Sequence, residues 1–296
     1  MRSMTMTSRI FRTSRIFRTS RTPRPAKTSL CLVSCLLVSS LLAAWSPEEL
    51  SGKPTKTLPI EGTVFEVAGH TAFLMLPTTR DAAKPTPWVW YAPTLPRLPG
   101  PEEKWMFDRF LAAGIAIAGV DVGESYGSPK GRGVYEALHR ELVEKRGLAK
   151  KACLLARSRG GLMLYSWAAE HPEQVACIVG IYPVCDLRSY PGVARACGAY
   201  EMSAAQLTTS LDKHNPIERL ESLARLRVPI FHLHGDRDRV VPLEKNSAEV
   251  AKRYRKLGGP IILRVVKGKG HDMWAGWFQS RELVEFVVRH AAGKRG

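Results

Sequence analysis

The stretch CLLARSRGG, residues 153–161, combines a hydroxyl nucleophile with the small residues of a tight turn. Its apolar half is typical of a buried strand, and a helix is expected from Gly160 onwards. Small residues two positions before and after Ser158 let strand and helix approach closely, so that the serine hydroxyl projects from a strained turn. Ala156 stands where glycine is more common. The N-terminus of the following helix favours negative charge that develops nearby, so Ser158 is the candidate nucleophile.

Two carboxylates follow a second apolar run in FHLHGDRDRVVP, residues 231–242. An acid at the end of a strand can reach an imidazole and fix its tautomer. Asp236 and Asp238 are both candidates. We expect Asp236 to bond its own backbone as a turn residue, which leaves Asp238 as the orienting acid.

A histidine in KGHD, residues 269–272, follows the last predicted strand. In this loop His271 would overhang the sheet end where Ser158 lies. Such a base takes the Ser158 proton while the serine attacks an ester or amide carbonyl, and it then activates the water that releases the acyl group. This chemistry needs no metal and no organic cofactor. No Cys or His spacing in the chain matches a zinc site.

Short apolar runs alternate with helix-like stretches from Gly62 onwards, which predicts an α/β fold with a mostly parallel central sheet and helices on both faces. The predicted strands cover 63–67, 71–76, 88–92, 115–120, 152–156, 175–181, 229–233 and 261–266. The predicted helices cover 102–113, 134–145, 160–170, 243–256 and 279–291. The interval 185–226 breaks the alternation, and it is either an insertion that forms a lid or an ordinary long crossover with a helix.

The chain resembles the α/β-hydrolase superfamily, within its prolyl-oligopeptidase-like and esterase-like branch, from about residue 60 to 292. The loop HGDRDRVVP resembles the acid loop of that branch, in which the acid is the fifth residue counted from the histidine, here Asp238. The stretches NPI (215–217) and LRVP (226–229) also recur in such proteins. The resemblance implies the α/β-hydrolase fold and a serine hydrolase, and the chain order Ser158, Asp238, His271 is the order that this fold uses.

The oxyanion hole of this fold takes one donor from the N–H after the nucleophile, here Arg159, and a second from the loop after the third strand. That loop reads WYAPTL, residues 90–95, and departs from the His-Gly pair that the family often has. Pro93 has no N–H to give. The second donor is therefore expected to be the Thr94 N–H or the Tyr91 hydroxyl.

Four further side chains are candidates for substrate binding, each with a structural alternative. Arg157 and Arg159 flank the nucleophile. They either recognise an anionic group of the substrate or brace the turn, and bracing is favoured. Glu124 and Tyr126 follow the fourth strand and either contact substrate or shape a turn. Trp274 either forms an apolar or sugar-stacking wall or packs against the last helix, and packing is favoured.

An esterase is the first expectation, because the chain lacks room for the large gating domain of prolyl oligopeptidases. The expected substrate is a small-molecule or carbohydrate ester. The alternatives are a peptidase of the same fold and a catalytically silent binding protein on the same scaffold. The 296 residues carry a net charge of +17, of which the first 44 residues supply eight basic side chains and no acid. The remaining excess is moderate, and no nucleic-acid-binding motif accompanies it.

The N-terminus is typical of a targeting segment. Residues 7–22 repeat the unit TSRIFR, and residues 30–45 form the apolar run LCLVSCLLVSSLLAAW. The length of this run favours a signal peptide over residues 1–45 and export of the protein. An uncleaved membrane anchor and an organellar transit peptide are alternatives. We expect a linker over 46–60 and the hydrolase domain over 61–296, in which Cys185 and Cys197 could form a disulfide after export.

Overall fold

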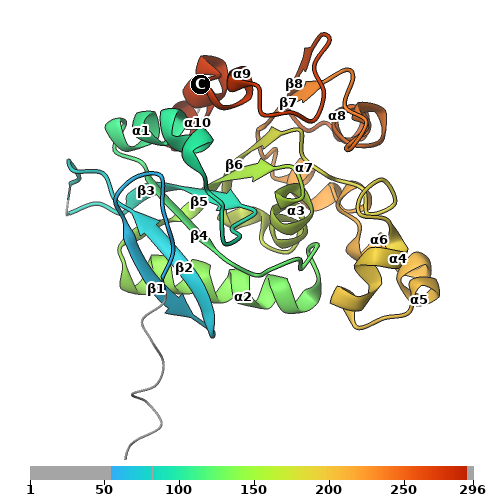
Figure 1. The fold of residues 1–296 in the computed structure, drawn as a ribbon, viewed down its shortest axis with the longest axis horizontal. Helices are drawn as coiled ribbons and strands as arrows, with labels where there is room; N and C mark the ends of the chain where they lie inside the picture. The colour runs from blue at the N-terminus through green and yellow to red at the C-terminus, as the bar shows by residue number, and fades with distance from the viewer. Residues whose placement is uncertain (1–54, 82, 292–296) are drawn as a thin grey trace, which may run out of the picture. The chain divides into compact units, whose positions relative to one another are not determined.

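The computed structural model describes residues 55–81 and 83–291, which form one mixed sheet covered by helices (Figure 1). The strands are β1 (Thr63–Val67), β2 (His70–Met75), β3 (Thr86–Ala92), β4 (Ala116–Val120), β5 (Leu148–Arg157), β6 (Val175–Ile181), β7 (Ile230–Gly235) and β8 (Ile261–Val266). Their order across the sheet is β1-β2-β4-β3-β5-β6-β7-β8. The pairs β1–β2 and β2–β4 are antiparallel, and every pair from β4 to β8 is parallel. This confirms the mostly parallel sheet predicted from the sequence.

Helices cover both faces of the sheet, as predicted (Figure 1). They are α1 (Lys104–Ala112), α2 (Pro129–Arg140), α3 (Gly160–Glu170), α4 (Val193–Ala196), α5 (Ala204–Thr209), α6 (Leu211–His214), α7 (Glu221–Arg225), α8 (Ser247–Lys256), α9 (Ala275–Phe278) and α10 (Arg281–Ala291). Side chains of a strand point alternately to its two faces. In β3, Trp88 and Trp90 therefore belong to the apolar cluster that includes residues of α2, α3, α7 and α8, whereas Val89 and Tyr91 belong to the cluster that includes residues of α1 and α10.

Two elements begin four or five residues earlier than the sequence pattern indicated. Helix α2 starts at Pro129, five residues before the predicted start, because the Ser128 hydroxyl accepts a hydrogen bond from the Gly131 N–H at 3.4 Å and proline suits the first helical turn. The predicted end of this helix, residues 141–145, is a π-helical turn. Strand β5 starts at Leu148, four residues before the predicted start, because Leu148 pairs with Thr86 of β3.

The interval 185–226 is a helical insertion and not a single crossover helix. It contains α4 to α7. Its part from α4 to α6 packs through its own apolar cluster against Leu162 of α3 and Val241 of the acid loop, whereas α7 packs in the main core. Cys185 and Cys197 both keep free thiols in this structure, and Cys185 is buried. The disulfide that these two residues could form after export is therefore not present in this structure.

The predicted signal peptide over residues 1–45 lies outside the described residues, and it stays a prediction. The end of the predicted linker is packed: Leu58 and Ile60 lie against the core on the α1 side of the sheet. Within 55–81 and 83–291, no helix is long and apolar enough to span a membrane.

Candidate active site

Ser158 occupies a strained turn between β5 and α3. Its φ of 49° lies in the left-handed region, which costs a non-glycine residue on the order of 1–3 kcal/mol. Two hydrogen bonds hold this backbone: the Ser158 N–H donates to the Ile181 carbonyl at 3.0 Å, and the Ser158 carbonyl accepts from the Val184 N–H at 2.8 Å. The neighbouring strand and the loop after it therefore fix the serine with its hydroxyl at the carboxyl edge of the sheet.

The glycine after this turn allows the close approach that the sequence predicted. A Cβ atom at Gly160 would lie 2.0 Å from the carbonyl oxygen of Ala92 at the end of β3. No side chain fits in this space, because the atoms it would meet belong to the backbone. The start of α3 therefore packs directly on the end of β3, and this contact holds Ser158 at the carboxyl edge of the sheet.

Replacing Gly160 with alanine should lower the free energy of unfolding by about 1–3 kcal/mol, because the added methyl group overpacks this contact. Hydrolysis should fall as well, since the turn that carries Ser158 must shift. Gly133 of α2 is the matched control, because a Cβ there meets nothing within 4 Å and alanine favours a helix interior by about 1 kcal/mol. Urea unfolding of the two variants checks the prediction, and equal stability of both would contradict it.

The structure brings together Ser158, His271 and Asp238, the three residues that the sequence analysis predicted to be catalytic. The Ser158 hydroxyl lies 2.9 Å from His271 Nε2, and His271 Nδ1 lies 2.8 Å from Asp238 Oδ2. The Tyr182 ring packs on the imidazole with 4.3 Å between ring centroids. This is the arrangement in which an acid orients a base and the base removes the serine proton.

The Asp238 carboxylate is fully buried, yet it is held in its ionised form. Burial alone would raise the pKa of Asp238. Hydrogen bonds from His271 and the Val241 N–H, together with the nearby His234 ring, outweigh the burial, and the pKa of Asp238 lies well below its ordinary value. Asp236, by contrast, accepts a hydrogen bond from the Gly268 N–H at 2.6 Å. This hydrogen bond joins the loops after β7 and β8. We had expected Asp236 to bond the backbone of its own turn instead, and the structure differs from that expectation.

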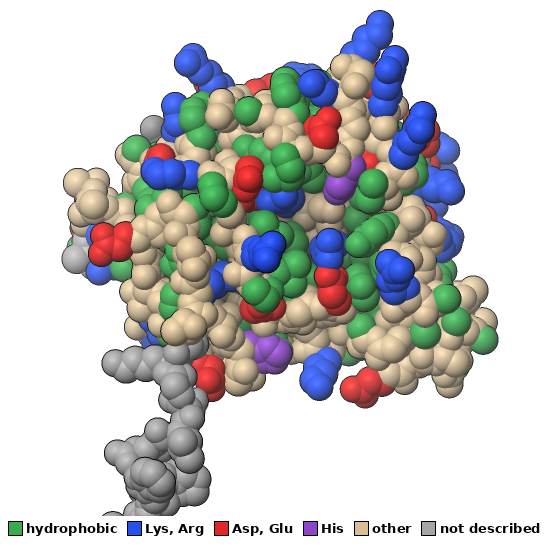
Figure 2. Space-filling view, viewed as in Figure 1, with side chains coloured by type: hydrophobic (Ala, Val, Ile, Leu, Met, Phe, Trp, Pro, Cys, Tyr) green, Lys and Arg blue, Asp and Glu red, His purple; other side chains and the backbone are tan. Residues whose placement is uncertain are grey.

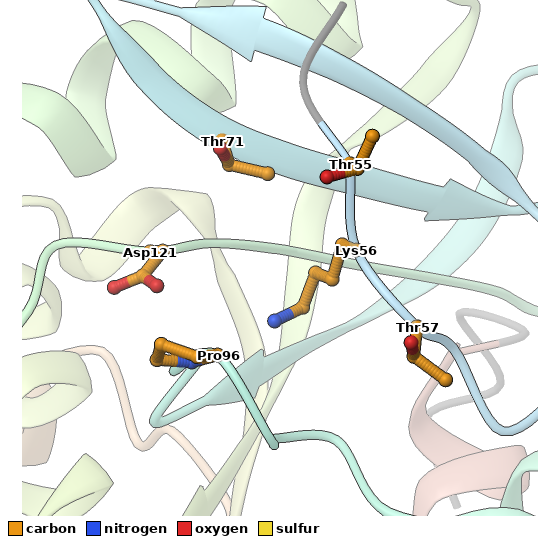
Figure 3. A pocket seen from close by; sticks show the side chains of 6 residues that line it. All are labelled: Thr55, Lys56, Thr57, Thr71, Pro96 and Asp121. Atoms are coloured by element: carbon orange, nitrogen blue, oxygen red, sulfur yellow. The ribbon is translucent and has the colours of Figure 1, made fainter.

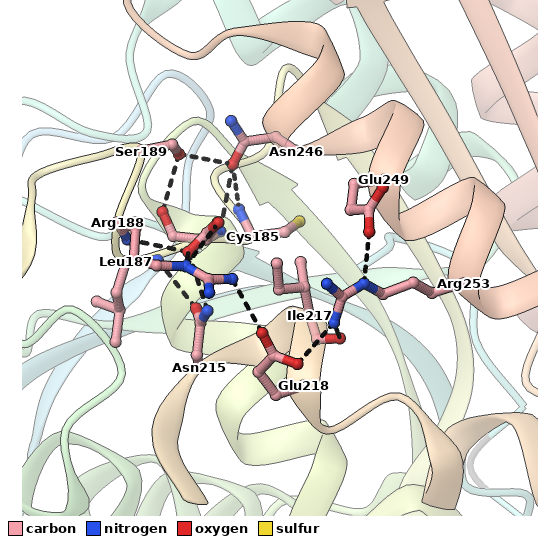
Figure 4. A network of polar contacts seen from close by, with 11 residues as sticks. Cys185, Leu187, Arg188, Ser189, Asn215, Ile217, Glu218, Asn246, Glu249 and Arg253 are labelled. Carbon is pink, nitrogen blue, oxygen red and sulfur yellow. Dashed lines mark hydrogen bonds and ion pairs between the residues drawn. The ribbon is translucent and has the colours of Figure 1, made fainter. Parts of the chain in front are cut away.

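The acid loop is tied to the base of the insertion by Asn246 (Figure 4). The Asn246 Oδ1 atom accepts from the Cys185 and Asp186 N–H groups and from the Ser189 hydroxyl, at 2.9, 3.2 and 3.1 Å. Its amide nitrogen donates to the Pro242 carbonyl at 2.9 Å. One buried side chain therefore links the loop that carries Asp238 to the segment where the helical insertion begins.

One of the two predicted second oxyanion donors is engaged elsewhere. The Tyr91 hydroxyl donates to Glu103 Oε1 at 2.8 Å in the core on the α1 side, so its prediction as an oxyanion donor is wrong for this structure. The Thr94 hydroxyl donates to the Tyr91 carbonyl at 3.3 Å, and its backbone pairs with Asp121 in an isolated β-bridge. Thr94 stays a prediction, as does the Arg159 N–H, which lies directly after the nucleophile at the start of α3.

The same loop is supported from outside by the first described residues of the chain (Figure 3). The Lys56 ammonium donates to the Leu95 carbonyl and faces Asp121 and Pro96 across a cavity of about 460 Å³. Burial lowers the pKa of Lys56, and the Asp121 charge only partly restores it. Within the described ranges, no group of three or more His, Cys, Asp or Glu residues could hold a metal ion.

Arg157 braces the turn. Its guanidinium donates to Glu103 Oε1 at 2.6 Å and lies 4.9 Å above the Phe278 ring. The Glu103 carboxylate is buried, and its second oxygen accepts from the Gly100 N–H at 2.8 Å. The geometry favours bracing over substrate binding for Arg157. Glu103 was missed in the sequence analysis, because it follows Glu102 at the start of a helix and the two look alike in sequence. The one local signal that separates them is Gly100, three positions before Glu103, whose N–H the Glu103 carboxylate caps.

The remaining predicted substrate residues separate into two groups. Glu124 forms an ion pair with Arg159, and both side chains are partly exposed beside the nucleophile. Tyr126 is buried in the cluster that holds the insertion, and its carbonyl accepts from the Tyr200 hydroxyl at 2.8 Å, so packing explains it. Trp274 stays 39% exposed with its edge against the Trp277 ring. Glu124 and Trp274 therefore remain candidates for contact with a substrate.

Positive charge surrounds the loops that carry the acid and the base. Figure 2 shows Lys and Arg side chains projecting around the β7–β8 end of the molecule. Arg237, Arg239 and Lys267, which lie in these two loops, are all exposed. Their field should draw anionic molecules towards this edge of the sheet.

A model of the prolyl oligopeptidase family matches residues 136–293, which include Ser158, Asp238 and His271. The chain belongs to this family. The matched part is more than half of the sequence, and it begins within α2 and includes all of α10. No curated protein matches the chain.

Solved structures show the same fold at low sequence identity. A puromycin-hydrolyzing peptidase from Mycobacterium tuberculosis is 17% identical with a TM-score of 0.60, over 79% of this chain and 41% of that chain. An S-formylglutathione hydrolase from Agrobacterium tumefaciens is 17% identical with a TM-score of 0.61, over 78% and 93%. Est1E from Butyrivibrio proteoclasticus is 16% identical with a TM-score of 0.58, over 79% and 99%. The fold is that of the α/β-hydrolases, as the resemblance implied, and this chain spans less than half of the peptidase.

Proposed function

We propose that this chain is a serine hydrolase in which Ser158 is the nucleophile, His271 the base and Asp238 the acid that orients the base. The observation that carries the proposal is the continuous hydrogen-bonded chain from the Ser158 hydroxyl through His271 to the buried Asp238 carboxylate. The strained φ of 49° at Ser158 supports it, because strain of this kind is retained where the surrounding structure holds a residue for function.

In the first step, His271 Nε2 takes the hydroxyl proton while Ser158 Oγ forms a bond to the carbonyl carbon of the substrate. The tetrahedral intermediate collapses, the protonated His271 gives its proton to the leaving group, and an acyl-enzyme remains. In the second step, His271 removes a proton from water, which attacks the acyl carbon. The bond to Ser158 Oγ then breaks, His271 returns the proton to Oγ, and the acid and the free serine are released. Asp238 stays ionised throughout and stabilises the imidazolium.

The Arg159 N–H is the donor that faces the developing oxyanion in this proposal. Arg159 is the N-cap of α3, whose N-terminal N–H groups favour negative charge at this point. Glu124 lies beside the nucleophile because it pairs with the Arg159 side chain. We propose that this ion pair lines one side of the substrate-binding site next to Ser158.

The preferred substrate in this proposal is a small ester. Two similar solved structures support it: the S-formylglutathione hydrolase matches over 93% of its chain, and a thermostable esterase matches over 62% of its chain with a TM-score of 0.58. A peptidase is the second candidate, because the family model and the puromycin-hydrolyzing peptidase favour it.

Parallel assays of 4-nitrophenyl butyrate and an aminoacyl 4-nitroanilide separate the two candidates. The proposal predicts that kcat/KM is at least about 100-fold higher for the ester, beyond the difference in the uncatalysed rates of the two substrates. A preference for the anilide after this correction would favour the peptidase. If neither substrate is turned over and a fluorophosphonate leaves Ser158 unmodified, the hydrolase proposal is wrong.

A further inference from the structure

His234 is a buried histidine that the mechanism above does not use. It lies on β7, four residues before Asp238, and its side chain is fully enclosed. We propose that His234 is a positioning residue that holds the Asp238 carboxylate towards His271. This inference rests on the proposed function, because it assigns His234 a role only through the orienting acid.

The hydrogen bonds of His234 fix which ring nitrogen carries a proton. Nε2 lies 2.8 Å from the Val241 carbonyl, which can only accept, so Nε2 carries the proton. Nδ1 lies 2.7 Å from the Ser247 hydroxyl at the start of α8, and this hydroxyl can donate to it. The network thus selects the tautomer whose N–H points into the acid loop.

The same ring nitrogen also lies near the catalytic carboxylate. Asp238 Oδ2 lies 3.5 Å from His234 Nε2 and 2.8 Å from His271 Nδ1, so one oxygen is placed between two imidazoles. The other oxygen, Oδ1, accepts from the Val240 and Val241 N–H groups at 2.9 and 2.8 Å. His234 holds the Val241 carbonyl, and Val241 holds Oδ1, so the imidazole fixes both the loop and the direction of the carboxylate.

His232 provides an internal comparison on the same strand. It is equally buried, and its Nε2 lies 2.7 Å from the Tyr165 hydroxyl. Burial, with a smaller effect from His234, lowers the pKa of His232 to about 3, so this side chain stays neutral. Its hydrogen bond goes to α3 and not to the acid loop. A change at His232 therefore perturbs the core without removing a donor from the Asp238 loop.

Two substitutions at His234 each keep one of its two hydrogen-bonding positions, Nε2 or Nδ1, and lose the other. In His234→Gln, the amide nitrogen lies as many bonds from Cβ as Nε2 and keeps a donor for the acid loop. In His234→Asn, the amide stops at the Nδ1 position, so it keeps a partner for Ser247 and loses the donor. The proposal predicts that His234→Asn lowers kcat for the nitrophenyl ester about 10- to 100-fold with little change in KM, whereas His234→Gln retains most of it.

A double-mutant cycle with Asp238→Asn tests whether His234 acts through the acid. If it does, His234→Asn costs much less in the Asp238→Asn background than in the wild type. His232→Asn should lower stability with little loss of kcat. Equal losses of kcat in His234→Asn, His234→Gln and His232→Asn, or additive losses in the cycle, would overturn the proposal.

A second readout does not depend on turnover. The low-field NMR signal of the His271 ring N–H, assigned by its loss in His271→Ala, reports the hydrogen bond to Asp238. It should weaken or vanish in His234→Asn and persist in His234→Gln and His232→Asn. If the wild type shows this signal but no hydrolysis, the proposed function is wrong while the positioning role is still tested. A signal unchanged in His234→Asn would overturn the positioning role alone.

Discussion

The variants Ser158→Ala and His271→Ala should each lower kcat for a nitrophenyl ester by on the order of 10⁴- to 10⁶-fold, with little change in unfolding free energy. Ser158 supplies the oxygen that forms the acyl-enzyme, and His271, 2.9 Å away, is the group placed to take its proton. Because the two residues act as a unit, the double variant should be about as slow as either single variant.

Ser166→Ala is the matched control for the loss of a serine hydroxyl. Ser166 lies in α3, eight positions after the nucleophile, and its buried hydroxyl has no hydrogen-bond partner among the described residues. Its removal should leave kcat unchanged. If Ser158→Ala kept more than about a tenth of the wild-type kcat, another residue would have to be the nucleophile.

The variant Glu103→Ala should lower the free energy of unfolding by about 3–5 kcal/mol, because it leaves the Arg157 guanidinium buried without its counter-charge. Arg157 and Glu103 have side chains 11% and 1% exposed, with 2.6 Å between nitrogen and oxygen. Ester hydrolysis should fall as well, since Arg157 directly precedes the nucleophile and a shift of its guanidinium reaches the Ser158 turn.

Two milder variants show whether the buried charge is the cause. Tyr91→Phe removes one hydrogen bond to Glu103 and keeps the ion pair, so it should cost only about 0.5–1.5 kcal/mol. Asp108→Ala breaks the exposed ion pair between Asp108 and Lys104 within α1, which should lower the free energy of unfolding by about 0–1 kcal/mol. Urea unfolding of all three variants gives the comparison. A loss in Glu103→Ala no larger than in Asp108→Ala would mean that this buried pair contributes nothing to stability.

The parts of the site that the sequence predicted are those fixed by local pattern and chain order. A buried strand followed by a serine between small residues predicts the turn at Ser158, because no other arrangement lets strand and helix approach so closely. The same reasoning selects Asp238 and His271, since each follows a parallel strand and the carboxyl ends of such strands share one edge of the sheet. These predictions need no knowledge of which side chains meet in the core.

The parts that the sequence did not predict depend on contacts between distant segments. Glu103 meets Arg157 only because α1 packs on the face of the sheet that Arg157 reaches, 54 positions away. The Tyr91 hydroxyl turns to the same carboxylate, which removes it from the oxyanion site where the loop sequence suggested it. The start of α2 was misplaced because the cap at Ser128 precedes the apolar positions on which the prediction relied.

The most direct test of the account is to treat the chain with a fluorophosphonate and to locate the adduct by peptide mass spectrometry. The account predicts one adduct, on Ser158, formed rapidly in the wild type and lost in Ser158→Ala. His271→Ala should slow the labelling by orders of magnitude, because the hydroxyl then lacks its base. Labelling of a different residue, or an unmodified Ser158 in folded wild-type protein, would contradict the assignment of Ser158, His271 and Asp238 as the catalytic residues.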